Sequence, residues 1–201
     1  VTYGYLLMLG AEGLKHVTEM AILNANYLAS SFEKLGFKIL FKGKQGRVGH
    51  EMIWDCSAFN KEYGISELDI AKRLMDFGFH APTLSFPVHG TLMVEPTESE
   101  PKEELDRFIE ALKTIREEMC EVAEGKADKT DNVLKNAPHT HKVLTADEWT
   151  HTYPRSKAAY PLPWVAENKF WPQAGRVDDG YGDRNLMCTC DPLYDYVNDE
   201  N

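Results

Sequence analysis

Apolar residues recur at intervals of three and four along residues 13–35, and this spacing gives one side of a long helix an apolar face. Gly36 follows directly and suits the C-terminal end of such a helix. A second long helix is predicted after Ser99 and Pro101, because apolar residues continue at the same interval as far as Val122. The two stripes predict two amphipathic helices, each with one side turned to a core.

Strands and one further helix are predicted between these two helices. Residues 37–41 and 50–56 have strand character and are separated by a glycine-rich loop at 42–49. Ser66 followed by Asp69 resembles the opening cap of a helix. Apolar residues behind this cap give the helix a broad buried side.

The segment after this helix is punctuated by proline. Gly78 is expected to end the helix, and the two prolines within residues 80–88 favour an extended crossing segment over a central strand. Strand character resumes at 91–95. The resulting order is strand, strand, helix, extended segment, strand, helix, which indicates an α+β fold with a small antiparallel sheet and helices on one face.

The periodicity disappears after Lys126, although six of the ten prolines and many aromatic residues lie beyond it. Disordered tails lack aromatic residues, so we expect this part to lie extended across a surface and to use its rings as contacts. That surface would belong to a missing part of the protein or to another subunit. The sequence is therefore divided into a leading helix at 1–36, an α+β domain at 37–125 and a C-terminal extension at 126–201.

Charge and composition exclude several classes of partner. The net charge is −10 and the basic residues do not form a stripe, so nucleic acid is not expected as a partner. No run of about 18 apolar residues predicts a membrane span, and no secretory leader is recognisable. The four cysteines are then expected to be reduced, which indicates the cytoplasm or, in a eukaryote, the mitochondrial matrix. Because Val1 leads into apolar sequence without a cap, we expect the chain to begin inside a larger protein.

Two neighbouring segments hold the first candidates for a functional site. His80, Thr83 and Ser85 lie in the proline-punctuated segment, where loops of α/β enzymes often place functional groups. His80 is a candidate for proton transfer or for lining a passage. The alternative is that the prolines merely shape a crossover. Glu95 and Thr97 follow the last strand and are candidates for the active-site side.

The residues around the second long helix have simpler interpretations. Glu98 and Ser99 fit a turn with an N-terminal cap. The outer side of the helix carries glutamates that we interpret as a solvated face. These are Glu103, Glu104, Glu110, Glu117, Glu118 and Glu121.

A glycine-broken polar loop, GRVDDGYGDRN, lies near the end of the chain. It is either a self-capping turn tied by pairs of aspartate and arginine or a site where one arginine binds a carboxylate, with Arg184 favoured over Arg176. Its acidic residues do not follow the order of a calcium loop. The loop carries Arg176, Asp178, Asp183, Arg184 and Asn185.

Cysteines and histidines give weaker signals. Cys188 and Cys190 provide only two ligands at a spacing uncommon for zinc, so no metal site is predicted, and a redox role for these thiols is weighed against an inert one. His139 and His141 are interpreted as solvated loop residues.

Several long stretches resemble one known family. They are EMAILNANYLA at 19–29, GISELDIAKRLMDFGFHAPTLSFPVHGTLMVEPTESE at 64–100, ELDRFIEAL at 104–112 and KFWPQAGRVDDGYGDRNLMC at 169–188. The chain is similar to the C-terminal part of glycine dehydrogenase (decarboxylating), the P-protein of the glycine cleavage system. The resemblance implies the C-terminal small domain of a fold type I pyridoxal phosphate enzyme, related in architecture to aspartate aminotransferase, with a long extended tail.

The resemblance also implies a reaction, which decarboxylates glycine and passes the aminomethyl group to the lipoyl arm of the H-protein. The family's Schiff-base lysine has a His-Lys-Thr context that this chain lacks, so no lysine here is expected to be catalytic. The fragment alone is expected to bind no pyridoxal phosphate and to be inactive. Its expected partners are an upstream large domain of the same protein, within a dimer-forming parent, and lipoylated H-protein.

Two other functions stay open on the residues alone. The chain could be a self-sufficient interaction module whose aromatic extension docks a partner such as the H-protein. A regulatory ligand-binding domain would need a compact pocket with convergent polar groups, which the sequence does not reveal.

Overall fold

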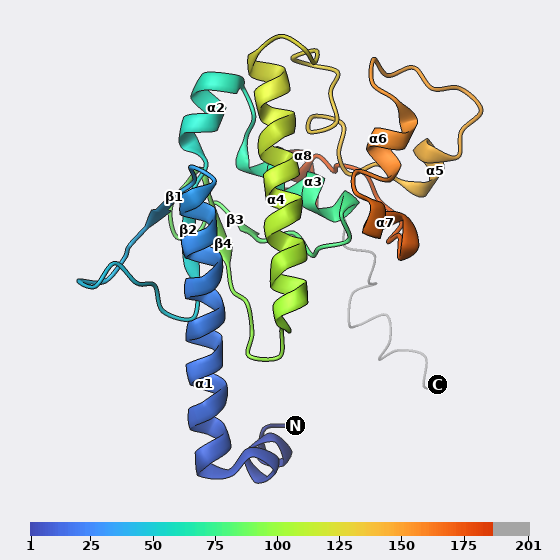
Figure 1. Cartoon of the computed structure of the whole chain (residues 1–201). Coiled ribbons are helices and arrows are strands. Elements are labelled where there is room, and N and C mark those ends of the chain that lie inside the picture. Colours follow the sequence, from blue (N-terminus) through green and yellow to red (C-terminus); the bar gives the residue numbers. More distant parts are fainter. Residues whose placement is uncertain (187–201) are drawn as a thin grey trace, which may run out of the picture.

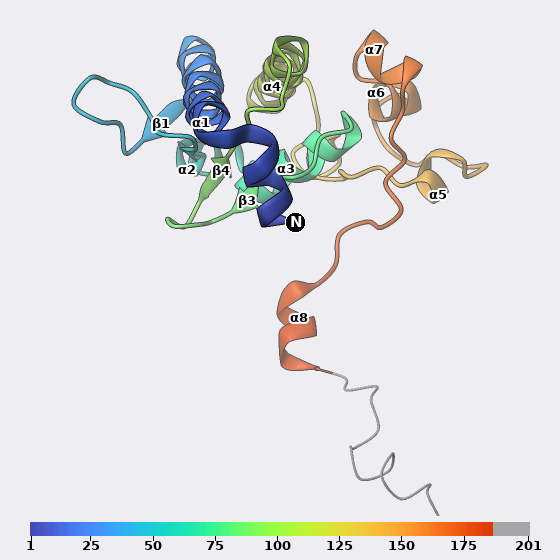
Figure 2. The same ribbon diagram turned by 90° about the horizontal axis from the view of Figure 1, so that it is seen from below.

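The computed structural model describes residues 1–186 of the chain (Figure 1). Its body is a four-stranded antiparallel sheet in the order β1-β2-β4-β3. Two long helices, α1 and α4, lie side by side over one face of this sheet (Figures 1 and 2). The predicted α+β class is therefore confirmed.

Helix α1 spans Thr2–Lys34 and is longer than the helix predicted at 13–35. Its first turns are set off by a break at Gly10, whose φ of 59° and ψ of −172° are not helical. The residues of α1 that are buried in the core begin only at Asn24. Gly36, at φ 83°, follows the end of the helix as predicted.

The strands are shorter than predicted but lie where the alternation places them. β1 spans Lys38–Leu40, β2 Met52–Asp55 and β4 Thr91–Val94. The proline-punctuated segment contributes only β3, Thr83–Leu84, at the sheet edge. A two-residue edge strand is what the flanking prolines allow, because proline cannot donate to a central ladder.

Helix α3, Glu67–Asp76, opens with the predicted capping box. The Asp69 amide donates to Ser66 Oγ at 3.3 Å, and the Ser66 amide donates to Asp69 Oδ2 at 2.9 Å. Gly78 follows the helix at φ 86°, a left-handed conformation that favours glycine.

The short helix α2, Ser57–Tyr63, is missing from the sequence-based prediction. It has no side-chain cap, and Phe59 is its one buried residue, so no apolar periodicity marks it. The helix ends at Gly64, which adopts a left-handed conformation with a φ of 70°.

Helix α4 spans Lys102–Ala123 and buries the predicted stripe. Two details of the prediction are wrong. Pro101, not Ser99, is the N-cap residue, and the Ser99 hydroxyl pairs with Thr97 Oγ1 at 2.7 Å. Glu118 is 3% exposed instead of solvated, because it forms an ion pair with a buried arginine, Arg73.

Aromatic side chains fill the centre of the core. The rings of Phe37 and Trp54 have centroids 4.5 Å apart, and Phe32 lies 5.6 Å from Trp54. Leu112 and Ile115 of α4 are fully buried with them. This core joins both long helices to the sheet through apolar contact.

The C-terminal extension folds differently from the expectation of an extended path. Within the described residues it forms short helices α5 (His141–Leu144), α6 (Arg155–Ala159), α7 (Pro163–Glu167) and α8 (Asp179–Arg184). The extension contacts α3 and α4 of this same chain, through Lys169 with the Asp76 carbonyl and through Lys157 with Glu121. Only α8 stands apart from the rest (Figure 2).

A small second core forms inside the extension. Leu144, Ala158 and Ala159 are buried there, and Trp149 and Trp171 pack against them. The positions of Cys188 and Cys190 lie outside the described residues. None of the helices within residues 1–186 has the length and apolar character needed to cross a membrane.

Candidate functional site

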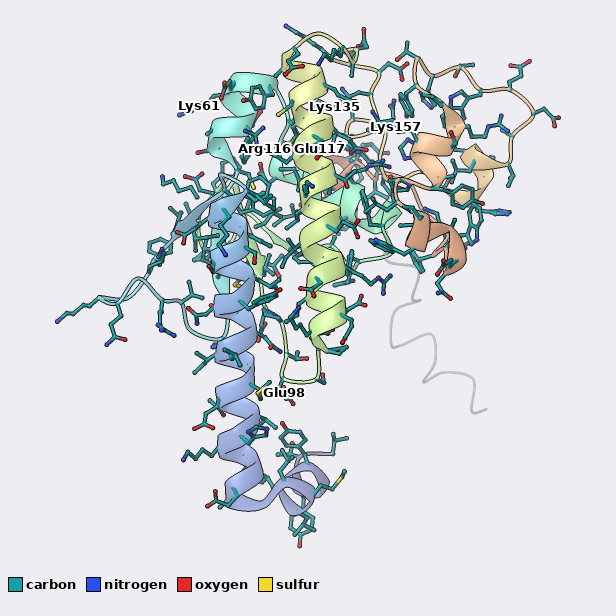
Figure 3. All side chains as sticks on the ribbon, in the orientation of Figure 1. Lys61, Glu98, Arg116, Glu117, Lys135 and Lys157 are labelled. Atoms are coloured by element: carbon teal, nitrogen blue, oxygen red, sulfur yellow. The ribbon has the colours of Figure 1, made fainter. Side chains whose placement is uncertain are left out.

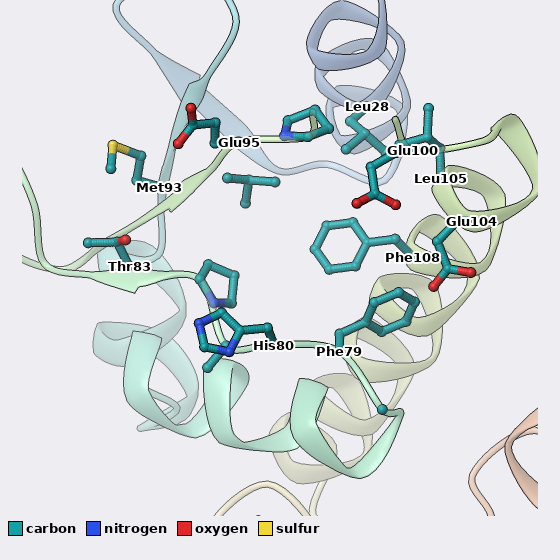
Figure 4. Close-up of a pocket in the computed structure, with 15 residues that line it drawn as sticks. Leu28, Phe79, His80, Thr83, Met93, Glu95, Glu100, Glu104, Leu105 and Phe108 are labelled. Atoms are coloured by element: carbon teal, nitrogen blue, oxygen red, sulfur yellow. The ribbon is translucent and has the colours of Figure 1, made fainter. Parts of the chain in front are cut away.

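A cavity of about 470 Å³ opens between the loop after α3, the end of β4 and the first turns of α4 (Figure 4). We call it the His80 pocket. Gly78 turns the chain out of α3, and the Phe79 amide still donates to the Leu74 carbonyl at 3.1 Å. The loop then carries His80 along the rim and delivers Thr83 to the sheet edge, where it pairs with Met93 of β4.

Carboxylates line the wall opposite His80. Glu95 directly follows β4, while Glu100 and Glu104 come from the connection into α4 and its first turn. Among the residues that line the pocket, the ionisable groups are His80 and these three glutamates. Such a wall favours a ligand that is cationic or donates hydrogen bonds, and it disfavours phosphate or carboxylate groups.

The inner part of the pocket is apolar. Phe79 and Phe108 meet edge to face with ring centroids 5.0 Å apart, and Leu28 of α1 and Leu105 of α4 complete this surface. The pocket therefore offers a hydrophobic lining with a few polar groups at the rim, as small-molecule sites commonly do.

Three of the predicted site residues, His80, Thr83 and Glu95, line this one pocket. Phe79, Phe108, Glu100 and Glu104 were not among the candidates. Phe79 could have been predicted as a pocket residue, because it directly precedes His80 in the stretch that resembles the family. Phe108 and Glu104 were hidden by helical periodicity, which assigned one to the core and the other to a solvated face.

The other predicted residues lie elsewhere. Thr97 is exposed, and its carbonyl accepts from Asn24 Nδ2 at 2.9 Å. Ser85 donates to Glu67 at 2.8 Å. Arg184 is the last residue of exposed α8, a helix that stands apart from the body (Figure 2), and it is not among the residues that line the His80 pocket. Thr97 and Arg184 do not line the His80 pocket. A functional role for either residue stays a prediction.

The polar loop GRVDDGYGDRN combines a self-capping turn with an arginine that binds a carboxylate, but the arginine is Arg176 and not the favoured Arg184. The ion pair of Arg176 is formed with an aspartate outside the loop. Asp178 caps α8 by accepting from the Tyr181 amide at 2.8 Å, as a self-capping turn would. Arg176 binds a carboxylate of this chain, since its Nη1 lies 2.7 Å from Asp69 Oδ1. Arg176 also donates to the carbonyls of Ala137 and Leu134 at 2.8 Å each.

A buried charged network joins α3 and α4 to the extension. Arg73 is fully buried; it donates to both carboxylate oxygens of Glu118, at 2.6 and 3.0 Å, and to Asp76 at 2.9 Å. It also donates to the carbonyls of Lys157 and Ala158 in the extension. Figure 3 shows Lys157 and Lys135 where α4 and the extension approach each other. One feature of the sequence could have revealed this network, because Arg73 and Asp76 lie on the otherwise apolar side of α3.

The surroundings set the protonation states in this network. Burial opposes the charged form of Arg73, but the carboxylates of Glu118 and Asp76 outweigh it and raise the pKa of the guanidinium above its usual value. Burial likewise opposes ionisation of Asp76, yet hydrogen bonds from His139 and the charge of Arg73 lower the pKa of that carboxyl. Both groups are therefore ionised at neutral pH.

The interpretation of His139 as a solvated loop residue is wrong. Its side chain is 1% exposed, its amide donates to Asp76 Oδ1 at 2.7 Å and its Nδ1 lies 2.7 Å from Asp76 Oδ2. Its Nε2 lies 2.7 Å from the Tyr153 hydroxyl. A run of loop-forming residues, PHTHK, concealed this burial. His141 is exposed, as predicted.

The residues of the His80 pocket do not form a pyridoxal phosphate site. Lysine and arginine are absent from its lining, so it offers neither an imine-forming amine nor cations for the phosphate. Within residues 1–186, no group of three or more histidine, cysteine, aspartate or glutamate side chains is arranged to hold a metal ion.

The fold and the pocket define an α+β domain with a cavity that is apolar inside and acidic at the rim. The chain belongs to the family described as glycine dehydrogenase, C-terminal domain, whose model matches residues 17–139. The family named from the sequence is thereby confirmed.

Several relatives carry the same name, glycine dehydrogenase (decarboxylating). The protein from Flavobacterium johnsoniae is 61% identical over 98% of this chain, and this match covers 20% of that relative. The proteins from Bdellovibrio bacteriovorus and Akkermansia muciniphila are 56% and 57% identical over 98% of the chain, covering 20% and 21% of their own lengths. The chain therefore spans about a fifth of the length of the curated relatives that it matches.

Proposed function

We propose that this chain works as the C-terminal part of a pyridoxal phosphate-dependent glycine decarboxylase of fold type I. Family membership and identity of 55–61% across nearly the whole chain support this assignment. The parent would transfer the aminomethyl group of glycine to the lipoyl arm of the H-protein and release carbon dioxide. It would act as a dimer in the cytoplasm or the mitochondrial matrix.

The cofactor would be held by an upstream large domain of the same polypeptide, where its pyridine ring supplies the electron sink for decarboxylation. The residues of the His80 pocket support this division of labour, because they lack a lysine and phosphate-binding cations. This chain would then contribute a wall of the active site or its access route.

The observation that carries the proposed role of this chain within the parent enzyme is the convergence of His80, Thr83 and Glu95 on one pocket. They come from GFHAPTLSFPV and EPTESE, two stretches on which the family resemblance rests. The acidic rim suits a ligand with an ammonium group, such as an aminomethylated arm, and the ring pair of Phe79 and Phe108 suits its apolar stem. His80 would bind this group or hold a proton for it.

The test uses the full-length parent and the exchange of carbon dioxide with the glycine carboxyl group. We expect His80→Gln to lower the rate by about 10²-fold, the lower range for loss of a group that assists proton transfer. His141→Gln is the matched control, because His141 is exposed on the extension. Equal rates for the two variants would exclude a role for His80.

The fragment alone provides a second test of the assignment. We expect the 201-residue chain to take up no pyridoxal phosphate, measured by visible absorbance after dialysis, and to show no exchange activity. Cofactor binding with exchange activity in this chain would overturn the division of labour proposed above.

The alternative function, an interaction module that docks the H-protein through aromatic residues of the extension, receives less support. Trp149, Tyr153 and Trp171 pack within the extension itself, so they are engaged inside this chain. A titration of the chain with lipoylated H-protein distinguishes the two functions, since an independent module should bind without the rest of the parent.

A further inference from the structure

The stretch KFWPQ at 169–173 precedes the polar loop and has no role in the function proposed so far. It crosses the C-terminal end of α3, the helix from which the rim of the His80 pocket departs. Lys169 Nζ donates to the Asp76 carbonyl at 2.7 Å. This carbonyl belongs to the last residue of α3, where helices leave acceptors without an internal partner.

Asp76 collects contacts from separate parts of the extension. Its carboxylate accepts from the amide and ring of His139, and its carbonyl accepts from Lys169. Arg73 holds the same carboxylate from within α3. The extension therefore makes polar contacts with the end of α3, two residues before Gly78 begins the pocket loop.

The loop at 78–81 has a cavity on either side. One is the His80 pocket, and the other, of about 450 Å³, is lined by Phe170 together with this same loop. A Cβ atom added to Gly78 would lie 3.7 Å from Phe170 Cβ, so the extension passes close beside the loop. Within this loop Phe79 packs on Phe108 and Trp164, whereas Gly78 and His80 are exposed. The positions of these two exposed residues therefore depend more on what holds the start of the loop.

We propose that Lys169 and Phe170 are positioning residues that hold the 78–81 loop and thereby place His80 at its pocket. The inference rests on the proposed function in that it takes the His80 pocket as the working site. Lys169 acts through the end of α3, and Phe170 acts through contact with the loop.

The charge and burial of Lys169 agree with this role. Burial lowers the pKa of its ammonium group to about 8, so the group is withdrawn from water in order to reach the carbonyl. Its Nζ also lies 6.0 Å from the centre of the Trp171 ring. A lysine that served only solubility would leave its ammonium group in water.

The test follows the loop in the 201-residue chain by amide hydrogen exchange and by the NMR signal of the His80 ring. The amides of Gly78 and Phe79 are suitable reporters, since they donate to Met75 and Leu74. We expect Lys169→Met to speed their exchange about tenfold or more and to shift the His80 signal, while the core amide of Trp54 is unchanged. Lys169→Arg should restore the wild-type behaviour, and Lys142→Met, on an exposed lysine of α5, is the matched control.

Three results would count against the inference. Unchanged exchange at Gly78 and Phe79 in Lys169→Met would show that the loop does not depend on this contact. Equal acceleration at Trp54 would show that Lys169 only stabilises the fold. If Lys169→Met does not fold, Phe170→Ala replaces it, because Phe170 is 54% exposed and its loss leaves the Asp76 contact intact. We expect this variant to shift the His80 signal, and an unchanged signal would count against the inference.

Measurements on the parent separate this inference from the proposed function. If Lys169→Met releases the loop but His80→Gln leaves glycine exchange unchanged, the proposed role of the pocket fails and the positioning role stands. If His80→Gln lowers exchange while Lys169→Met leaves both loop and rate unchanged, the positioning role fails alone.

Discussion

The α+β body and the C-terminal extension differ in what stabilises each of them. The body closes around a large apolar core in which Trp54, Phe32 and Leu112 are fully buried. The extension has a second core of only Leu144, Ala158 and Ala159, with partly buried rings around it. The extension also contributes Val133, Leu134 and Val165 to the core of the body. Because its own core is so small, the extension is held to the body by these apolar residues together with specific polar contacts.

Those polar contacts converge on two aspartates of α3. Asp69 receives Lys135 and Arg176, each at 2.7 Å, and Asp76 receives His139 and Lys169. Both aspartates are at most 1% exposed. Buried charges thus add to the apolar contacts that join the extension to the body, so a substitution of a charged residue at this junction should weaken the attachment of the extension.

The largest effect is expected from Arg73→Met. The change leaves the carboxylates of Asp76 and Glu118 buried without their cation, and breaking a buried pair from one side costs about 3–5 kcal/mol. The free energy of unfolding from urea titration, followed by tryptophan fluorescence, measures this loss.

The matched control is Arg47→Met in the exposed loop at 42–49, expected to change stability by no more than about 0.5 kcal/mol. If the two variants lost similar stability, the buried network would not be what joins the extension to the body.

A pair of identical truncations compares the two cores directly. Leu112→Ala in the body should cost about 2–5 kcal/mol, the range for a well-packed core leucine. Leu144→Ala should cost less, because its small cluster gives up fewer contacts and can collapse more easily. Thermal unfolding of both variants gives the comparison, and a larger loss at Leu144 would reverse our view of the extension.

A smaller effect is expected from Asp69→Asn, and it should depend on pH. Burial opposes ionisation of Asp69, but hydrogen bonds from Lys135, the Ser66 amide and Arg176 lower the pKa of its carboxyl in the folded state. A lowered folded pKa contributes stability that is present above the unfolded value of about 3.9 and is lost as the pH falls below it.

At neutral pH the variant should lose about 1 kcal/mol, since the two cationic partners are each 30% exposed and partly screened. Below pH 4 the difference between wild type and variant should shrink, as measured by unfolding at a series of pH values. A difference that grew with acid would contradict the lowered pKa.

Prediction from the sequence succeeded where burial is periodic. The stripe of α4, the capping box of Ser66 and Asp69 and the glycine end of α3 are local patterns, and local patterns fix element type. It failed at α2, which buries only Phe59, and at Glu118 and His139, whose burial depends on partners far away in the chain. A charged residue on a helix looks solvated until its distant partner is known.

The sequence by itself determined the α+β class of the body, the order of its strands and of its longer helices, and the family resemblance, because these depend on local spacing and on motifs. Only the tertiary structure decided that His80, Thr83 and Glu95 share one pocket and that the extension covers this chain through Asp69 and Asp76. The physical reason is that ion pairs and pocket walls join residues tens of positions apart. Nothing in the local pattern of either partner specifies such a contact.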